Sequence, residues 1–98
     1  MSVTCGSRDE ATTIADALVQ QRLVACAHLT PIASVYEGND VVEHDEEILL
    51  TAVTRVDCFD AIVDAVRALH SYELPAITAV AVDGSRDYLD WVKAQTRH

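Results

Sequence analysis

The stretch Ile32-Ala33-Ser34-Val35-Tyr36-Glu37-Gly38-Asn39-Asp40-Val41-Val42 decides the fold of this 98-residue chain. Residues 37–40 have the composition of a tight turn. Residues 23–29 and 32–36 on one side read as a long strand interrupted at Pro31, because a proline within a sheet is confined to an edge or a bulge. Residues 41–54 on the other side form a second long strand, acidic at its start and apolar in its second half. The sequence therefore predicts a long β-hairpin in the middle of the chain.

A strand and a helix are predicted before the hairpin. Residues 3–5 form a short strand, and apolar residues at helical spacing predict a helix over residues 9–21. The helix starts with a capping box, in which the Ser7 hydroxyl accepts from the backbone N–H of Glu10 and the Glu10 carboxylate can reach back.

A helix and a strand are also predicted after the hairpin. Asp57 is expected to cap a helix whose inner face consists of apolar residues, namely Phe59, Ile62, Val63, Val66 and Leu69. A fourth strand is expected over residues 75–82. Ser85 then caps a short C-terminal helix.

The order of these elements is β-α-β-β-α-β with an added helix, which is typical of a ferredoxin-like α+β domain. We expect one domain over residues 1–98, with an antiparallel four-stranded sheet and both main helices on one face. The long hairpin has apolar stretches on both of its faces, and no further helix remains to cover them. Self-association is the expected way to bury that surface, although the sequence alone fixes neither the copy number nor the symmetry.

Sixteen acidic residues against seven basic ones give the chain a net charge of -9. This charge repels nucleic acids and anionic membranes and attracts cations, so neither nucleic acid nor membrane is an expected partner. Only one basic residue, Lys93, is a lysine, a composition that also suits a protein kept soluble in high salt. The chain has no run long enough for a membrane span and no secretory signal at its start, so a cytoplasmic location is expected.

The acidic run Glu43-His44-Asp45-Glu46-Glu47 lies at the start of the second long strand. In a strand, Glu43, Asp45 and Glu47 share one face while the other two residues share the opposite face. We interpret the run as a solvated or charge-paired rim, with a metal-binding row as the alternative.

The segment Leu69-His70-Ser71-Tyr72-Glu73-Leu74-Pro75-Ala76-Ile77 places a histidine, a tyrosine and an acid between a predicted helix and a predicted strand. Polar groups at such a junction are held by two regular elements yet remain open to solvent, where sites are usually built. The structural alternative is that His70 favours a helix C-terminus and Tyr72 covers a core edge.

Five segments carry a family resemblance when they are taken together: Cys5-Gly6-Ser7-Arg8-Asp9-Glu10-Ala11, Arg22-Leu23-Val24-Ala25-Cys26-Ala27, Tyr36-Glu37-Gly38, His70 to Ile77, and Tyr88-Leu89-Asp90-Trp91-Val92. In order and spacing they resemble the CutA divalent-cation tolerance proteins over nearly the whole chain. The resemblance implies a ferredoxin-like subunit in a tight homotrimer, similar to PII-type signalling proteins, with roles in metal tolerance and copper binding. Three positions depart from the family pattern: Ser71 replaces a proline, Tyr36 replaces a tryptophan, and Asn39 stands where a lysine is common.

The resemblance nominates Cys5 and His70 as metal ligands for copper(II) or another divalent cation. Two ligands are too few for a tight site, so Glu73 or the acids of the hairpin are expected to contribute as well, including from a neighbouring subunit. Thiolate, imidazole and carboxylate groups all suit such metals. The dipole of the helix after Cys5 is expected to lower the pKa of its thiol, and His70 offers an uncharged imidazole near neutral pH. The sequence does not fix whether these side chains meet, and a structural role is the alternative for each.

Tyr36, Glu37 and Tyr72 form a second candidate set, as walls of a cleft between subunits. Their alternative roles are interface packing and turn formation. A PII-like trimer that binds a small molecule in such clefts is the alternative to a metal-tolerance function. The chain has no GxSxG, HExxH or P-loop motif, so we do not expect an enzyme. The expected partners are copies of the chain itself and divalent metal ions.

Overall fold

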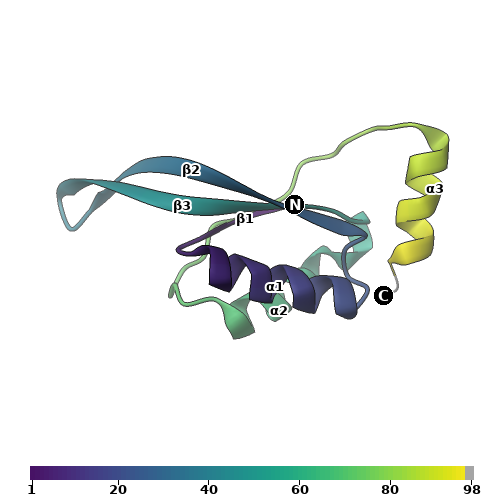
Figure 1. Ribbon diagram of the computed structural model, residues 1–98, viewed down its shortest axis with the longest axis horizontal. Helices are drawn as coiled ribbons and strands as arrows, with labels where there is room; N and C mark the ends of the chain where they lie inside the picture. The colour runs from purple at the N-terminus through teal and green to yellow at the C-terminus, as the bar shows by residue number, and fades with distance from the viewer. Residues whose placement is uncertain (97–98) are drawn as a thin grey trace.

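The predicted hairpin is the longest feature of the structure (Figure 1). In the computed structural model, which describes residues 1–96 of the predicted domain 1–98, β2 (Cys26–Gly38) and β3 (Val41–Val53) pair antiparallel along their whole length. Asn39 and Asp40 form the two-residue turn between them, with positive φ values of 55° and 65°. Asn and Asp tolerate this left-handed conformation, and its twist matches that of the strands it connects.

The sheet has four antiparallel strands in the order β2-β3-β1-β4, where β1 is Ser2–Cys5 and β4 is Ile77–Thr78. Both main helices, α1 (Arg8–Gln20) and α2 (Phe59–Leu69), lie on the same face of this sheet (Figure 1). The predicted α+β, ferredoxin-like arrangement is therefore confirmed. Pro31 does not interrupt β2, because β2 is an edge strand whose outer side needs no ladder hydrogen bonds.

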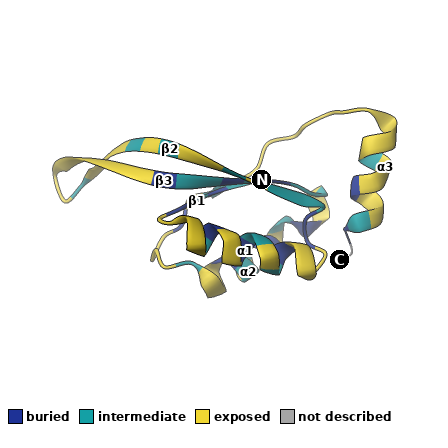
Figure 2. Ribbon diagram, in the orientation of Figure 1, coloured by how far each residue is buried: buried dark blue, intermediate teal, exposed yellow. Residues whose placement is uncertain are grey.

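The core lies between the sheet and the two helices, where Figure 2 shows the buried residues. The core includes side chains from four elements, namely Val3 and Cys5 from β1, Ile14 and Leu18 from α1, Leu50 from β3, and Ile62 and Val66 from α2. All seven side chains are fully buried. The alternation of each strand and the helical spacing of α1 and α2 direct these residues inward.

Serine caps begin α1 and the last helix, α3 (Arg86–Gln95), as predicted. The backbone N–H of Glu10 donates to the Ser7 hydroxyl oxygen at 3.2 Å, and that of Tyr88 donates to the Ser85 hydroxyl oxygen at 3.3 Å. Each cap satisfies one of the backbone donors that a helix start leaves free.

The predicted Asp57 cap of α2 is wrong. Asp57 lies inside a short 3-10 turn, η1 (Val56–Cys58), and Cys58 precedes α2 without a side-chain cap. The Asp57 carboxylate lies 3.3 Å from the guanidinium of Arg55 instead. The extra turn moves the cap position from Asp57 to Cys58, one residue further along the chain.

The predicted fourth strand over residues 75–82 is also wrong in its length, because β4 contains only Ile77–Thr78. Its neighbour β1 begins at Ser2, which pairs with Thr78, so the residues after Thr78 have no strand of residues 1–96 paired with them. Residues 79–85 run as an open segment from the sheet to α3 (Figure 1). Val80 and Val82 in that segment are 78% and 68% exposed.

The face of the sheet opposite α1 and α2 stays largely without a helix, as predicted. The last helix, α3, lies at one end of the sheet (Figure 1), where the Tyr88 hydroxyl lies 3.4 Å from the Cys26 sulfur. Arg22, in the turn before β2, donates to Gln95 of this helix at 3.3 Å. None of the helices described within residues 1–96 has both the length and the apolar character needed to cross a membrane.

Candidate functional site

The loop between α2 and β4 brings Tyr72 across the end of β1 to the long hairpin. The Tyr72 hydroxyl donates to Glu47 Oε2 on β3 at 2.7 Å. Gly6 makes room for this crossing, because a Cβ at that position would lie only 3.0 Å from the Tyr72 hydroxyl oxygen. Residues that are 25 positions apart in the chain are thereby joined at one point.

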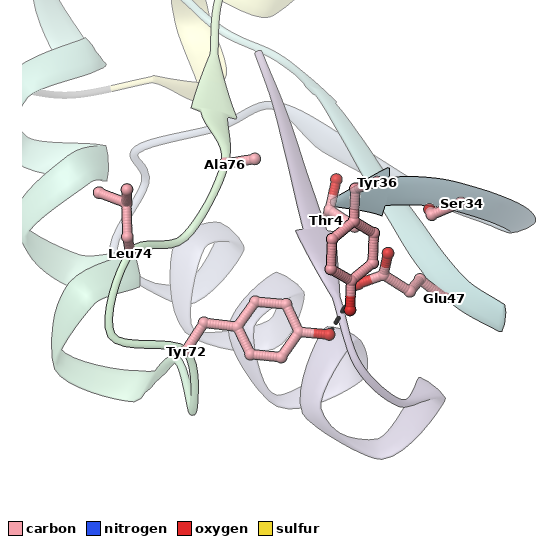
Figure 3. Close-up of a pocket in the computed structure, with 7 residues that line it drawn as sticks. All are labelled: Thr4, Ser34, Tyr36, Glu47, Tyr72, Leu74 and Ala76. Carbon is pink, nitrogen blue, oxygen red and sulfur yellow. Dashed lines mark hydrogen bonds between the residues drawn. The ribbon is translucent and has the colours of Figure 1, made fainter. Parts of the chain in front are cut away.

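A hollow of about 380 Å³ opens beside this hydrogen bond (Figure 3). Its walls come from β1, β2, β3 and the loop before β4, and they consist of Thr4, Ser34, Tyr36, Glu47, Tyr72, Leu74 and Ala76. The Tyr36 hydroxyl donates to the carboxylate of Asp45, the hairpin residue opposite Ser34. The hollow therefore has two phenol rings, an apolar side and an acidic side.

The acidic groups of the hairpin raise the pKa of both tyrosines. The hydrogen bond to Asp45 and, after it, burial and the charges of Asp45, Glu43 and Glu47 raise the pKa of Tyr36 to about 12. The hydrogen bond to Glu47, with burial and the nearby negative charges, likewise raises the pKa of Tyr72. Both phenols thus remain protonated at neutral pH and act as hydrogen-bond donors.

His70 holds the loop that carries Tyr72. Its side chain is fully buried, and Nε2 donates to the backbone carbonyl of Thr4 at 2.7 Å. Its Nδ1 accepts from the backbone N–H of Tyr72 at 3.0 Å, and the two rings lie 4.7 Å apart between centroids. A carbonyl oxygen only accepts, so these two bonds define a neutral imidazole with its hydrogen on Nε2.

Glu10 fixes the same loop from α1. Its carboxylate accepts from the backbone N–H of Ser71 at 3.0 Å and from the Ser71 hydroxyl at 2.8 Å, and it lies 3.2 Å from His70 Nδ1. Burial by itself would raise the pKa of Glu10, but the two hydrogen bonds from Ser71 outweigh it and lower the pKa. The reciprocal half of the predicted capping box is therefore wrong, since Ser71 offers this carboxylate two donors.

Comparison with known proteins decides the family. Residues 1–95 match the family described as CutA1 divalent ion tolerance protein. The chain belongs to this family. The divalent-cation tolerance protein CutA of Thermus thermophilus is 40% identical over 96 residues, which is 96% of this chain and 93% of that protein. The resemblance drawn from the five sequence segments is thereby confirmed.

The solved structures agree with this assignment to the CutA1 family. A solved structure of the divalent cation tolerance protein CutA1 from Thermus thermophilus has a TM-score of 0.94 and 39% identity, and covers 98% of this chain and 95% of that chain. Protein CutA of Homo sapiens is 40% identical over 96% of this chain, but the chain spans only 54% of the human protein. A relative in Arabidopsis thaliana is described as chloroplastic, and a structure from Archaeoglobus fulgidus as periplasmic.

The residues nominated as metal ligands of this CutA1 family member lie as follows. Cys5 is fully buried in the core. Burial, followed by the charges of Glu10 and Glu47, raises the pKa of its thiol to about 11, so the predicted lowering by the helix dipole is wrong. Both ring nitrogens of His70 are engaged in hydrogen bonds, and Glu73 is exposed on the loop. Among residues 1–96, no three His, Cys, Asp or Glu side chains gather in a metal-binding group.

The nominated cleft residues lie in two places. Tyr36 and Tyr72 line the same hollow, whereas Glu37 is exposed and, one position along β2 from Tyr36, belongs to the other face of the hairpin. The sequence pattern does not reveal the role of Glu47, which belongs to the run interpreted as a solvated or charge-paired rim but is only 8% exposed. The available signal was its position as the last acid before the apolar run that starts at Ile48.

Proposed function

We propose that this CutA1 family member acts as a homotrimer in divalent-cation tolerance and binds copper(II) or another divalent cation. The proposal takes its function from the family and its trimeric state from the CutA resemblance, which implies a trimer similar to that of PII-type proteins. The net charge of -9 favours cations over anions. Binding, and not catalysis, is the proposed activity.

The uncovered edge of the sheet is the observation that supports assembly most strongly. Residues 79–82 have no strand of this subunit beside them, and Val80 and Val82 are exposed. An apolar edge of this kind pairs with another chain unless the protein protects it. A second copy of the chain is the occupant that the homotrimer provides.

Within residues 1–96 of one subunit, the nominated residues do not gather into a copper site. The Cys5 thiol is buried and protonated, and using His70 Nε2 as a ligand would break its hydrogen bond to Thr4. A thiolate must lose its proton before it binds a metal. We therefore propose that cation binding depends on the trimer, in which side chains from neighbouring subunits complete the ligand set.

Calorimetric titration of the full chain with copper(II) tests this function, and stoichiometric uptake is expected. The assignment of Cys5, His70 and Glu73 stays a prediction that the same titration decides. A fall in uptake in the double variant Cys5→Ala/His70→Ala and in Glu73→Gln supports these ligands, whereas unchanged uptake refutes them. Cys58→Ala/His44→Ala is the matched control, because it removes the same two side-chain types elsewhere. No uptake by the unaltered chain contradicts copper binding itself.

A second candidate function is a PII-like trimer that binds a small molecule, and the hollow lined by Tyr36 and Tyr72 favours it. A thermal-shift screen with a panel of metabolites is expected to find a stabilising compound whose effect is lost in Tyr72→Ala. Tyr88→Ala is the control, since Tyr88 lies on α3 outside the hollow. The absence of any stabilising compound counts against this function.

The proposed location is the cytoplasm. The three cysteines are all free, which suits a compartment that keeps thiols reduced. Fractionation of the source cells tests this location, and recovery of the chain from another compartment contradicts it.

A further inference from the structure

Glu47 is a buried carboxylate without a counter-charge. It is 8% exposed, and its hydrogen bond in the described structure comes from the neutral hydroxyl of Tyr72 to Oε2. Within residues 1–96 it takes part in no ion pair. Acidic side chains are rarely buried unless they are paired, because burial removes the water that stabilises the charge. A positive group beside Glu47 would compensate the charge of its carboxylate.

The hollow beside Glu47 has the lining of a site for a cation. Glu47 is the only charged residue among the seven that line it, and the rings of Tyr36 and Tyr72 belong to two different elements of the chain (Figure 3). Aromatic rings attract cations through the negative charge of their faces. Arg8 borders a separate hollow that also reaches Glu47, yet it forms no ion pair with Glu47 in the described part of the chain. An anion would meet repulsion here.

The volume of the hollow and the few metal-ligating groups in its lining favour an organic cation over a bare metal ion. Its volume of about 380 Å³ falls within the range of sites for small organic molecules. A divalent metal requires several oxygen, nitrogen or sulfur ligands, whereas this lining offers one carboxylate. The two phenols remain protonated and already donate to Glu47 and Asp45. Leu74 and Ala76 add apolar surface for a hydrocarbon part.

We propose that the hollow binds a small organic ammonium ion, with Glu47 as its counter-ion and the rings of Tyr36 and Tyr72 as its walls. The inference rests on the second candidate function, in which this hollow holds a small molecule, and it names the chemical class of that molecule. Leu74 and Ala76 contact the apolar part of the ligand. The class is defined by a charged nitrogen next to a hydrocarbon group.

Calorimetric titration of the full chain with three probes of similar shape tests this proposal. Benzylammonium is the cation, benzyl alcohol its neutral counterpart and benzoate its anionic counterpart. Benzylammonium is expected to bind at least about tenfold more tightly than benzyl alcohol, and benzoate is not expected to bind. Glu47→Gln is expected to reduce benzylammonium affinity to that of benzyl alcohol. Glu43→Gln, which removes the same charge from an exposed position on the same face of β3, is expected to change it less than about twofold.

Tyr36→Leu provides a second variant that does not alter a buried group, because Tyr36 is 47% exposed. It removes one aromatic wall and is expected to weaken benzylammonium binding while the affinity for benzyl alcohol changes less. The proposal is overturned if benzylammonium does not bind, if it binds no more tightly than benzyl alcohol, or if Glu47→Gln and Glu43→Gln lose affinity equally.

The metabolite screen distinguishes a failure of the ammonium proposal from a failure of the second candidate function. A neutral or anionic stabiliser whose effect is lost in Tyr72→Ala would leave the second candidate function standing and overturn the ammonium class. If neither the screen nor benzylammonium gives binding, both are wrong. Copper uptake by Glu47→Gln would then show whether the same carboxylate serves the first candidate function.

Discussion

The two halves of the hairpin carry similar side chains in opposite surroundings. Near the body of the subunit, Leu50 and Ala52 lie beneath the helices and are 0% and 2% exposed. Toward the turn, Val35 and Val42 belong to the same face of the hairpin but are 66% and 60% exposed. Alternation therefore sets the direction of a side chain, whereas another layer of protein decides whether it is buried. The core stabilises the lone subunit, and in the proposed homotrimer another copy buries the projecting half.

The largest expected effect comes from the buried half of the hairpin. Leu50→Ala removes a fully buried side chain and is expected to lower the free energy of unfolding by about 3 kcal/mol. Urea denaturation monitored by circular dichroism measures the loss. A loss as small as that of an exposed residue would contradict the position of the core.

Val35→Ala tests whether the projecting half of the hairpin is covered by another copy. If Val35 stayed exposed, the loss would be about 0.5 kcal/mol or less. We expect more than about 1 kcal/mol, because a neighbouring copy covers this residue in the proposed homotrimer. Denaturation at several protein concentrations checks the reason, since a loss through assembly depends on concentration. A small decrease in the free energy of unfolding that does not depend on protein concentration would show that no other copy buries Val35.

Glu47→Gln is expected to raise the free energy of unfolding by about 1 kcal/mol in the absence of any ligand. The substitution keeps an acceptor for the Tyr72 hydroxyl while it removes a charge that is 8% exposed. Glu43→Gln is the control and is expected to change stability by less than about 0.5 kcal/mol. A destabilised Glu47→Gln variant would indicate that the carboxylate already has a compensating partner.

The smallest effect concerns the Glu10–Ser71 contact and depends on pH. Ser71→Ala is expected to cost about 1 kcal/mol near neutral pH. Because the pKa of Glu10 is lowered from its ordinary 4.5 in the folded protein, this stabilisation is present above pH 4.5 and is lost as the pH falls through the lower value. Denaturation of both proteins over a pH series measures the difference. An equal cost at all pH values would mean that the Glu10 charge is not involved.

Local patterns predicted most of the fold. The turn composition of residues 37–40, the helical spacing in α1 and the serines at positions 7 and 85 act within a few residues, so the sequence contains their cause. The length of β4 was not predictable in the same way. It depends on where β1 begins, and the apolar run of residues 75–82 contains no information about its neighbour.

The site was predictable only in part. Tyr36 and Tyr72 were found because the family resemblance marked them, and the structure places both in one hollow. The alternation of residues 43–47 gave the face of Glu47 but not its burial, which follows from Tyr72 crossing the end of β1. The thiol of Cys5 was judged from its position before a helix. Its surroundings in the core and the charges of Glu10 and Glu47 outweigh that effect.

Sedimentation equilibrium of the full chain, at micromolar concentration and in both moderate and high salt, measures whether the subunit assembles with identical copies. We expect a single species with three times the 10.7 kDa mass of one chain, because identical copies cover the projecting hairpin and residues 79–82 in the proposed homotrimer. A well-folded species of 10.7 kDa under these conditions would contradict it.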